Sequence, residues 1–286
     1  MSEASAKRIY CCEQNTQEPL FGTADTVDVW VLLEYKPVWK PKALADNSLD
    51  GATRTWLQRS LDELAAAGIK ARPQFIRRPE MDSDTVQLFV GTGDGLLNLS
   101  GRGYGFLESV RLTELLAAAP AEHRVAEPRY FVCTNGQRDV CCARYGLPVY
   151  AGLRERVGGR AWQITHLGGH RFAPNVLTLP QGALYGRLSD AMLDDFVATV
   201  EAGALDFEHL RGRSCLPPAA QAAEALAGRS DLTLVDTRAG ADGLITVRFD
   251  GPDGPLEVPV RPGPAVQVLK SCDDPAPKSV TPFQRV

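Results

Sequence analysis

The first half of the chain combines apolar runs of strand type with one long amphipathic segment. Val27–Tyr35 is an almost continuous apolar run, which predicts a strand buried on both faces. Thr53–Ala67 carries apolar residues at helical spacing, and Gly68 follows it, as is common where a helix ends. The other predicted elements are strands at Ile69–Arg77 and Thr85–Gly91, a turn at GTGDG, a short extended piece near Leu96–Leu99 and a helix at Leu112–Ala119.

The second half repeats this order. Its predicted elements are a strand at Arg129–Thr134, a helix at Val140–Val157 interrupted near Gly146 and Pro148, strands at Ala161–Thr165 and Val176–Leu179, and a helix at Asp190–Ala202. The stretches FIRR and QLFVG of the first half correspond to QITH and LTLPQG of the second. We interpret this as an internal duplication of an α/β unit; the alternative is a chance similarity of two common α/β patterns.

The C-terminal part has a different pattern. Asp206–Ser214 is predicted to be a linker or cap, and a helix is predicted to follow Pro217, because proline suits a first helical turn. Strand patterns then occur at Leu232–Thr237, Leu244–Phe249 and Leu256–Val260, with Val266–Lys270 as a candidate fourth. The sequence thus predicts an N-terminal α/β domain at residues 1–125, a second α/β domain at 126–205, and a small α+β unit at 206–286.

Composition narrows the class of protein. The chain has 286 residues, 44% hydrophobic and 23% charged, which fits a folded globular protein. Its net charge of -4 argues against a nucleic-acid binder that neutralises phosphates. No run approaches the roughly 18 apolar residues of a membrane helix, and the start, MSEASAKRIYCCEQN, lacks the apolar region of a secretory signal. We therefore expect a cytoplasmic protein without membrane contact; the sequence predicts no oligomeric state.

Candidate metal ligands are concentrated in one segment. The chain has seven cysteines and four histidines, and five of these residues lie between positions 133 and 170: Cys133, Cys141, Cys142, His166 and His170. In a reducing compartment, clustered cysteines more often bind metal or do redox work than form structural disulfides. His123 and His209 stand alone, as structural histidines do. Cys11, Cys12, Cys215 and Cys272 form no spaced metal set.

The predicted elements bring these ligands together. Cys133 ends a strand, where α/β folds place their sites. Cys142 lies at the start of the next helix, whose free N–H groups stabilise thiolates, and Asp139 is placed to cap that helix. His166 ends a further strand, and two glycines let the chain turn so that His170 can face the same point.

Two cysteines and two histidines suit several kinds of site. Structural zinc with Cys2His2 ligation is one, although zinc fingers space their cysteines more closely. A Rieske centre is excluded, because its two loops each supply one Cys and one His. A non-Rieske 2Fe-2S cluster with the same ligands fits the order. A thiol redox site at Cys141-Cys142 is a further alternative, but the chain has no C-x-x-C motif.

Three motifs carry a resemblance to a known family. The segments CTNGQRDVCC, HLGGHRFAPN and LPQGALYGRL resemble those of the sucrase/ferredoxin-like family of thioredoxin-like 2Fe-2S proteins. EPLFGTA, LRGRSCLPPAAQAAEAL and SCDD are also similar to family segments, so the resemblance covers nearly the whole chain. The name implies no sugar chemistry here, because no paired-carboxylate motif is present.

The resemblance implies a thioredoxin-like ferredoxin fold with one 2Fe-2S cluster. The ligands it implies are Cys133, Cys142, His166 and His170. Alignment through Gly136, Arg138 and Asp139 favours Cys142 as the second thiolate, and Cys141 is the alternative. Arg138 and Arg171 would add positive charge near the cluster or contact a partner; a solvated surface role is the alternative for each. The first half has Glu34, Tyr35 and Arg77-Arg78 at the corresponding positions, so it would carry no cluster.

The activity implied is one-electron transfer to or from a redox partner protein, rather than turnover of a substrate. Neutral imidazoles leave less negative charge on a cluster than thiolates do, so its reduction is expected to be easier than in an all-cysteine ferredoxin. The outer ring nitrogens of His166 and His170 can release protons, which predicts proton-coupled electron transfer.

Overall fold

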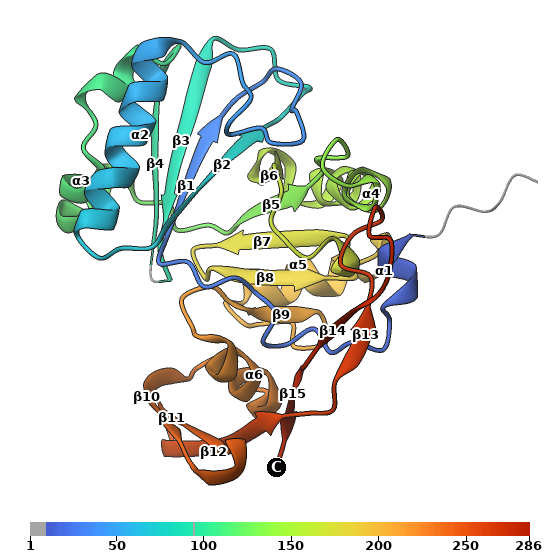
Figure 1. The fold of residues 1–286 in the computed structure, drawn as a ribbon. Helices are drawn as coiled ribbons and strands as arrows, with labels where there is room; N and C mark the ends of the chain where they lie inside the picture. Colours follow the sequence, from blue (N-terminus) through green and yellow to red (C-terminus); the bar gives the residue numbers. More distant parts are fainter. Residues whose placement is uncertain (1–9, 94) are drawn as a thin grey trace, which may run out of the picture.

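One mixed sheet holds most of the chain. Among the described residues, 10–93 and 95–286, nine strands form this central sheet: β1 (Val29–Glu34), β2 (Ala71–Arg77), β3 (Thr85–Gly91), β4 (Leu96–Arg102), β5 (Arg129–Cys133), β6 (Ala161–Ile164), β7 (Asn175–Leu179), β8 (Ala183–Gly186) and β9 (Leu210–Arg213). In this computed structural model they lie in the order β4-β3-β1-β2-β6-β5-β7-β8-β9. The sheet curls, so that β1 to β4 stand upright in Figure 1 while β7 and β8 run across. Residues 1–9 and Asp94 of the GTGDG turn lie outside the described residues.

The two halves of the central sheet have the same topology. β1 pairs with β2 in parallel and with β3 in antiparallel orientation, and β5 pairs in the same way with β6 and β7. β4 and β8 each add a further antiparallel strand. The halves join through the antiparallel pair β2 and β6, where Ile76 lies opposite Ile164. The predicted α/β class and its repeated unit are thus confirmed; the domain boundaries at residues 125 and 205 stay predictions.

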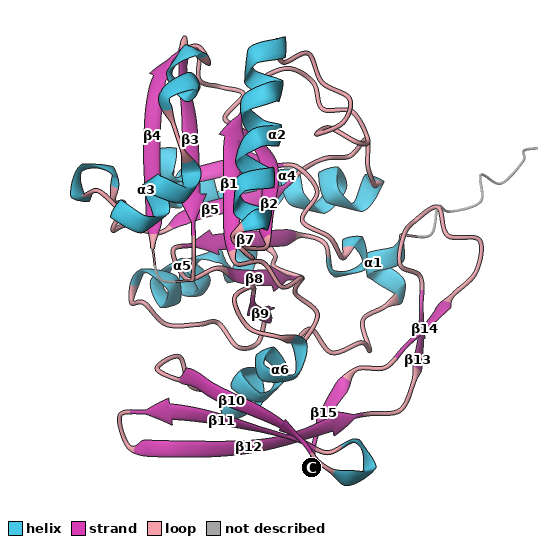
Figure 2. Cartoon of the chain, turned by 60° about the vertical axis from the view of Figure 1, so that its left-hand side comes forward, coloured by secondary structure: helices cyan, strands magenta, loops and turns pink. Residues whose placement is uncertain are grey.

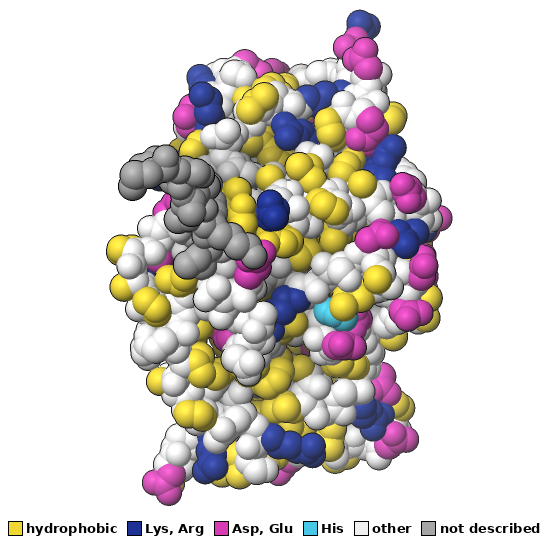
Figure 3. Space-filling view, turned by 90° about the vertical axis from the view of Figure 1, so that its right-hand side faces the viewer, with side chains coloured by type: hydrophobic (Ala, Val, Ile, Leu, Met, Phe, Trp, Pro, Cys, Tyr) yellow, Lys and Arg dark blue, Asp and Glu magenta, His cyan; other side chains and the backbone are white. Residues whose placement is uncertain are grey.

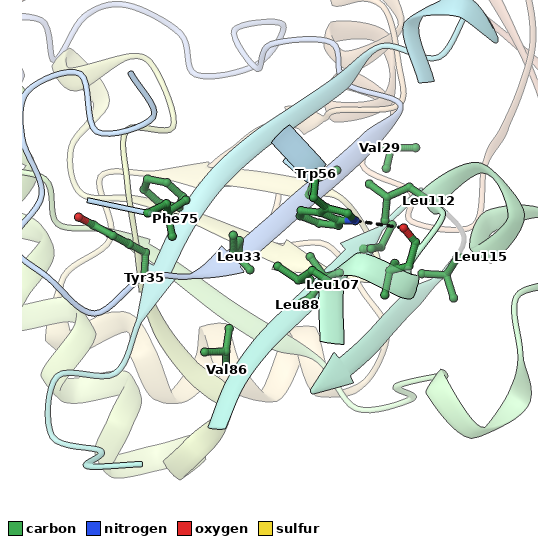
Figure 4. Close-up of a cluster of buried hydrophobic side chains, with 14 of the residues drawn as sticks. Val29, Leu33, Tyr35, Trp56, Phe75, Val86, Leu88, Leu107, Leu112 and Leu115 are labelled. Atoms are coloured by element: carbon green, nitrogen blue, oxygen red, sulfur yellow. Dashed lines mark hydrogen bonds between the residues drawn. The ribbon is translucent and has the colours of Figure 1, made fainter. Parts of the chain in front are cut away.

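Helices cover both halves of the sheet. α2 (Gly51–Ala66) and α3 (Leu112–Ala118) pack on the first half, and α4 (Val140–Val157) and α5 (Leu193–Glu201) pack on the second (Figure 2). Figure 4 shows the apolar cluster under α2, where Trp56 lies among Leu33, Leu88 and Leu112. The indole Nε1 of Trp56 donates to the carbonyl oxygen of Val110 at 3.1 Å, so its polar atom is satisfied inside the core.

Helix α4 is continuous, and the interruption predicted near Gly146 and Pro148 is wrong. Pro148 lies on the exposed face of the helix. The carbonyl group that its missing N–H leaves free is that of Arg144, four residues earlier and also exposed, so water can satisfy it. Gly146 is buried, and a Cβ there would clash with the carbonyl oxygen of Cys133. The glycine therefore lets α4 approach the end of β5.

The sheet extends further than the sequence pattern predicts. The segment 206–214, predicted to be a linker or cap, contains β9, which pairs with β8; β8 itself was not predicted. Both strands have four residues, too few for a clear period-two pattern. The predicted helix at Asp190–Ala202 begins as a 3₁₀ turn at Asp190–Met192 before α5. The N-terminal segment contains the short helix α1 (Cys11–Gln14), which is not among the elements predicted from the sequence.

The C-terminal part forms a separate layer and then returns to the N-terminal segment. Helix α6 (Pro218–Ala227) packs against a sheet of β10 (Thr233–Ala239), β11 (Ile245–Gly251), β12 (Gly254–Pro262) and β15 (Phe283–Arg285). The strands β13 (Val266–Val268) and β14 (Lys278–Val280) form a ribbon that runs back toward α1 (Figures 1 and 2). There Asn15 donates from Nδ2 to the carbonyl oxygen of Leu269 at 2.6 Å and accepts from its N–H at 3.1 Å.

None of the helices in the described part of the chain is long and apolar enough to cross a membrane.

Candidate metal centre

The four ligands predicted from the sequence come together at one end of the second half. Cys133 ends β5, Cys142 lies in the first turn of α4, His166 follows β6, and His170 begins a 3₁₀ turn. The ligand atoms of Cys133, Cys142 and His166 all lie within 4.8 Å of one another. His170 completes the group: its Nδ1 lies 3.6 Å from the Sγ of Cys142, and its ring stacks on that of His166 with centroids 4.1 Å apart. We refer to these four residues as the Cys2His2 group.

Asp139 fixes the start of the helix that carries Cys142. Its Oδ1 accepts a hydrogen bond from the N–H of Cys141 at 2.9 Å, so the predicted N-cap is present. Its other carboxylate oxygen lies 4.0 Å from the Nδ1 of His170. The side chain of Asp139 is fully buried there. The cap therefore positions the first turn of α4 and places a negative charge beside the histidine.

The loop between the histidines is held by its carbonyl groups. Gly168 and Gly169 adopt φ of 85° and 70°, in the left-handed region that favours glycine. The carbonyl oxygen of Gly168 accepts from Nη1 of Arg211 at 3.0 Å, and that of Gly169 accepts from Nδ2 of Asn175 at 3.0 Å. Arg211 also donates to the Oδ1 of Asn175 at 2.8 Å. The loop thus keeps one shape by bonds to β7 and β9.

The first half of the sheet holds the same loop from the other side. The carbonyl oxygen of His166 accepts from Nε2 of Gln74 at 3.1 Å and from Nη2 of Arg72 at 3.2 Å. Both donors lie on β2. The half without the predicted cysteines and histidines therefore positions the histidine loop. The residues Glu34 and Arg77 of that half lie at the ends of β1 and β2, and neither belongs to a group able to hold a metal among the described residues.

Electrostatics favours the metal-binding form of two donors of the Cys2His2 group, Cys133 and His170. A hydrogen bond from Cys142 holds the pKa of the Cys133 thiol well below its usual range, and the same bond raises the pKa of Cys142. Burial, together with the neighbouring ring of His166, lowers the pKa of His170 to about 4. Cys133 therefore favours the thiolate form, and His170 is neutral at pH 7 with a lone pair free to bind a metal.

One buried ring nitrogen fits the binding of a metal. The Nδ1 of His166 is buried and has no hydrogen-bond partner among the described residues. His166 is partly exposed and lines a cavity of about 340 Å³ together with Lys42, Arg72 and Arg138. A buried polar atom without a partner is costly, and a bound metal would satisfy it.

The two arginines named in the sequence analysis have different environments. Arg138 lines the cavity beside His166, which fits positive charge near the site. The guanidinium of Arg171 is mostly buried rather than solvated, and it makes two hydrogen bonds to the buried carboxylate of Glu18, at 2.6 and 2.8 Å. This pair fastens the segment before β1 to the turn that carries His170.

A second group of cysteines lies on the other side of Asp139. Cys141 is 3.3 Å from Cys12, 3.2 Å from Cys272 and 3.6 Å from Cys11, measured between Sγ atoms. We refer to Cys11, Cys12, Cys141 and Cys272 as the four-cysteine group. This group was not predicted from the sequence, because its cysteines come from three segments far apart in the chain, without any motif spacing. Cys215 belongs to neither group.

The surface near the N-terminal segment is mixed in character. Figure 3 shows the face turned toward α1 and the C-terminal ribbon, where basic, acidic and apolar side chains are interspersed and a histidine reaches the surface. Over the part that the grey residues leave uncovered, no large area of one charge stands out.

The fold and the site define an α/β protein with groups of cysteine and histidine side chains that can bind a metal. Comparison with known families gives the same class: the sequence matches the sucrase/ferredoxin-like family over residues 20–212. The chain belongs to this family. No curated protein and no solved structure matches it.

Proposed function

We propose that the Cys2His2 group holds a 2Fe-2S cluster and that the protein transfers single electrons to or from a redox partner. The observation that carries this proposal is the convergence of two thiols and two imidazoles around the unpartnered Nδ1 of His166. Two thiolates and two imidazoles are the donors that a cluster of this kind accepts. The family to which the chain belongs supports the same assignment. When bound, the cluster supplies one-electron redox chemistry.

The protein would contribute a rigid and largely dry site. Cys133, Cys142 and His170 are buried, and only His166 among the four is partly exposed. The bonds from Arg211 and Gln74 to the histidine loop hold both rings in place before anything binds. Rigid ligands lower the cost of rearrangement when charge changes at a site, which favours fast electron transfer.

Histidine ligands would also couple a proton to the electron. A ring that binds a metal through one nitrogen keeps a proton on the other. His166 is partly exposed, so solvent can exchange this proton. Added negative charge favours the protonated ring. The reduction potential is therefore expected to fall as the pH rises through the range in which this proton is lost.

The redox partner is expected to dock at the exposed edge of His166, since electron transfer favours the shortest path from the surface. Lys42 and Arg138 lie at this edge beside the cavity. Their positive charges favour a partner with acidic side chains at its contact surface.

Metal and sulfide analysis tests the proposal. The protein is made and purified without oxygen, and iron, zinc and acid-labile sulfide are measured with a visible spectrum before and after dithionite. We expect about two irons and two sulfides per chain and a red-brown colour that bleaches. A colourless protein with zinc bound to His166 and His170 would instead show a structural zinc site. Disulfide exchange activity without metal would favour a thiol oxidoreductase at Cys133 and Cys142.

A further inference from the structure

The four-cysteine group lies where the fold can hold a second metal. The ligand atoms of Cys11, Cys141, Cys272 and Asp139 all lie within 4.8 Å of one another, and Cys12 contacts Cys141. The four thiols come from α1, from the first turn of α4 and from the loop after β13. The Sγ atom of Cys141 lies at the centre of the contacts, and the Sγ atoms of Cys11 and Cys272 lie 3.6 Å apart. These segments are separated by more than a hundred residues of chain, so the fold itself brings the four thiols together.

We propose that Cys11, Cys12, Cys141 and Cys272 bind one zinc ion, at a site separate from the Cys2His2 group. Soft thiolates select thiophilic ions, and a set of four is the common donor set of structural zinc. On binding, the thiols lose their protons to solvent and each sulfur forms one bond to Zn²⁺. No electron is transferred, so the step needs no oxidant or reductant.

The sulfur separations favour a single ion over a multi-iron cluster. Four thiolates at about 2.3 Å from one zinc stand about 3.8 Å apart. The Sγ atom of Cys141 lies 3.2 to 3.6 Å from those of its three partners, and a small expansion would bring these separations to that value. In a multi-iron cluster each cysteine would bind a different iron, so the thiolates would stand further apart.

A backbone N–H group donates to one of the sulfur atoms, as is common at metal sites. The N–H of Cys11 donates to the Sγ of Cys272 at 3.5 Å. Asp139 lies close enough to compete as a ligand, but its Oδ2 already accepts from the N–H of Cys272 at 3.0 Å and from Ser271 Oγ at 2.9 Å. The carboxylate therefore holds the Cys272 loop in place, as groups around a metal site do. Cys12, whose Sγ lies 3.3 Å from that of Cys141, is the thiol placed to move in and complete the set when the ion binds.

The location of the site suggests what it does for the fold. Cys11 and Cys12 lie before the region that matches the family, residues 20–212, and Cys272 lies after it. A zinc ion there would tie both flanking segments to the first turn of α4. That turn also carries Cys142 and is already capped by Asp139, so the ion would add to the stability of the helix start without being required by the Cys2His2 group.

Metal analysis of the full-length protein tests this inference. Zinc and iron per chain are measured for the wild type and for Cys272→Ser, with Cys215→Ser as a control that removes a cysteine outside both groups. We expect about one zinc per chain in the wild type and in Cys215→Ser. Cys272→Ser should lose its zinc to a chelator at least about tenfold more readily and keep its iron. His166→Gln should show the reverse, with iron lost and zinc retained.

Cobalt binding to the wild-type chain provides a second measurement that does not depend on any variant folding. Co²⁺ is added without oxygen to the iron-loaded protein after its zinc has been removed, so that the Cys2His2 group is already filled. Strong sulfur-to-cobalt absorption and the intense bands of a tetrahedral site should appear, and Zn²⁺ should displace the cobalt. The inference is overturned if the wild type binds neither zinc nor cobalt. It is also overturned if zinc retention is the same in Cys272→Ser and the wild type, or if the anaerobically purified protein holds these cysteines as disulfides.

Discussion

Cys141 and Cys142 are adjacent in the chain, but their sulfur atoms belong to different groups. The Sγ of Cys142 lies 3.6 Å from Nδ1 of His170, whereas the Sγ of Cys141 lies 3.3 Å from that of Cys12. Successive residues of a helix point about 100° apart, so one helical turn serves two sites. The buried carboxylate of Asp139 lies between them and contacts both. The geometry therefore favours Cys142 over Cys141 as the partner of Cys133.

Replacing Arg211 should loosen the histidine loop. Arg211→Ala removes the donor from the part-buried carbonyl oxygens of Gly168 and Thr23 and from the buried Oδ1 of Asn175, which should lower the free energy of unfolding by about 3 kcal/mol. Arg211→Lys should recover little, because an ammonium cannot reproduce the guanidinium geometry. Urea unfolding measures the free energy of unfolding, and the amount of iron retained shows whether the Cys2His2 group is intact. Exposed Arg261→Ala is the control, and equal losses in the two alanine variants would contradict the assigned role.

Gly146 should be required for the approach of α4 to β5. A methyl group at Gly146 would meet the carbonyl oxygen of Cys133, so Gly146→Ala should destabilise the protein by about 1–3 kcal/mol and weaken iron retention. Gly51→Ala at the start of α2 meets nothing within 4 Å and should be neutral or slightly stabilising. Thermal unfolding of both variants makes the comparison. A stable Gly146→Ala protein with full iron content would show that the close approach is not needed.

The stability of the metal-free protein should depend on the charge of His170. Its pKa is about 4 in the folded protein, compared with an ordinary value of 6.5. Burial, His166 and Arg138 oppose a positive charge on the ring, and they outweigh Asp139 and Cys133, which favour that charge. Between pH 4 and pH 6.5 the unfolded chain binds more protons at this residue than the folded protein does. The contribution of His170 to the free energy of unfolding is therefore complete above pH 6.5 and is lost as the pH is lowered toward 4. The loss should reach at most about 3 kcal/mol.

Chemical unfolding of the metal-free wild type and of His170→Asn across this range measures the effect. The difference between the two proteins removes the contributions of other groups. We expect the wild type to lose more stability than the variant as the pH falls. Parallel curves would mean that His170 titrates normally in the folded protein.

Replacing His166 with cysteine should lower the reduction potential and weaken its pH dependence. A thiolate adds negative charge at the site and carries no exchangeable ring proton. Potentiometric titration at several pH values compares wild type, His166→Cys and the control His123→Gln, whose ring belongs to neither group. A wild-type potential that stays constant from neutral to alkaline pH would contradict proton coupling.

The sequence was sufficient to predict the core elements and the convergence of the Cys2His2 group. It was not sufficient to predict features that depend on contacts between residues far apart in the chain. Strong local patterns gave β1, β3 and α2 close to their observed bounds. Cys133, Cys142, His166 and His170 lie within one repeated unit, so local order was enough to predict their convergence. The role of Arg211 was missed because its segment lacks a clear strand pattern. The four-cysteine group was missed because Cys272 reaches Cys141 only through the folded C-terminal ribbon.

The most direct test of the central claim is the nitrogen hyperfine coupling of the dithionite-reduced protein. Pulsed electron paramagnetic resonance is recorded on wild type grown with ¹⁵N-histidine and on His170→Cys grown in the same way. We expect coupling to two histidine nitrogens in the wild type and to one in the variant, in which Cys133 and Cys142 are unchanged. A paramagnetic signal without histidine coupling, or no paramagnetic signal from an iron-loaded protein, would contradict it.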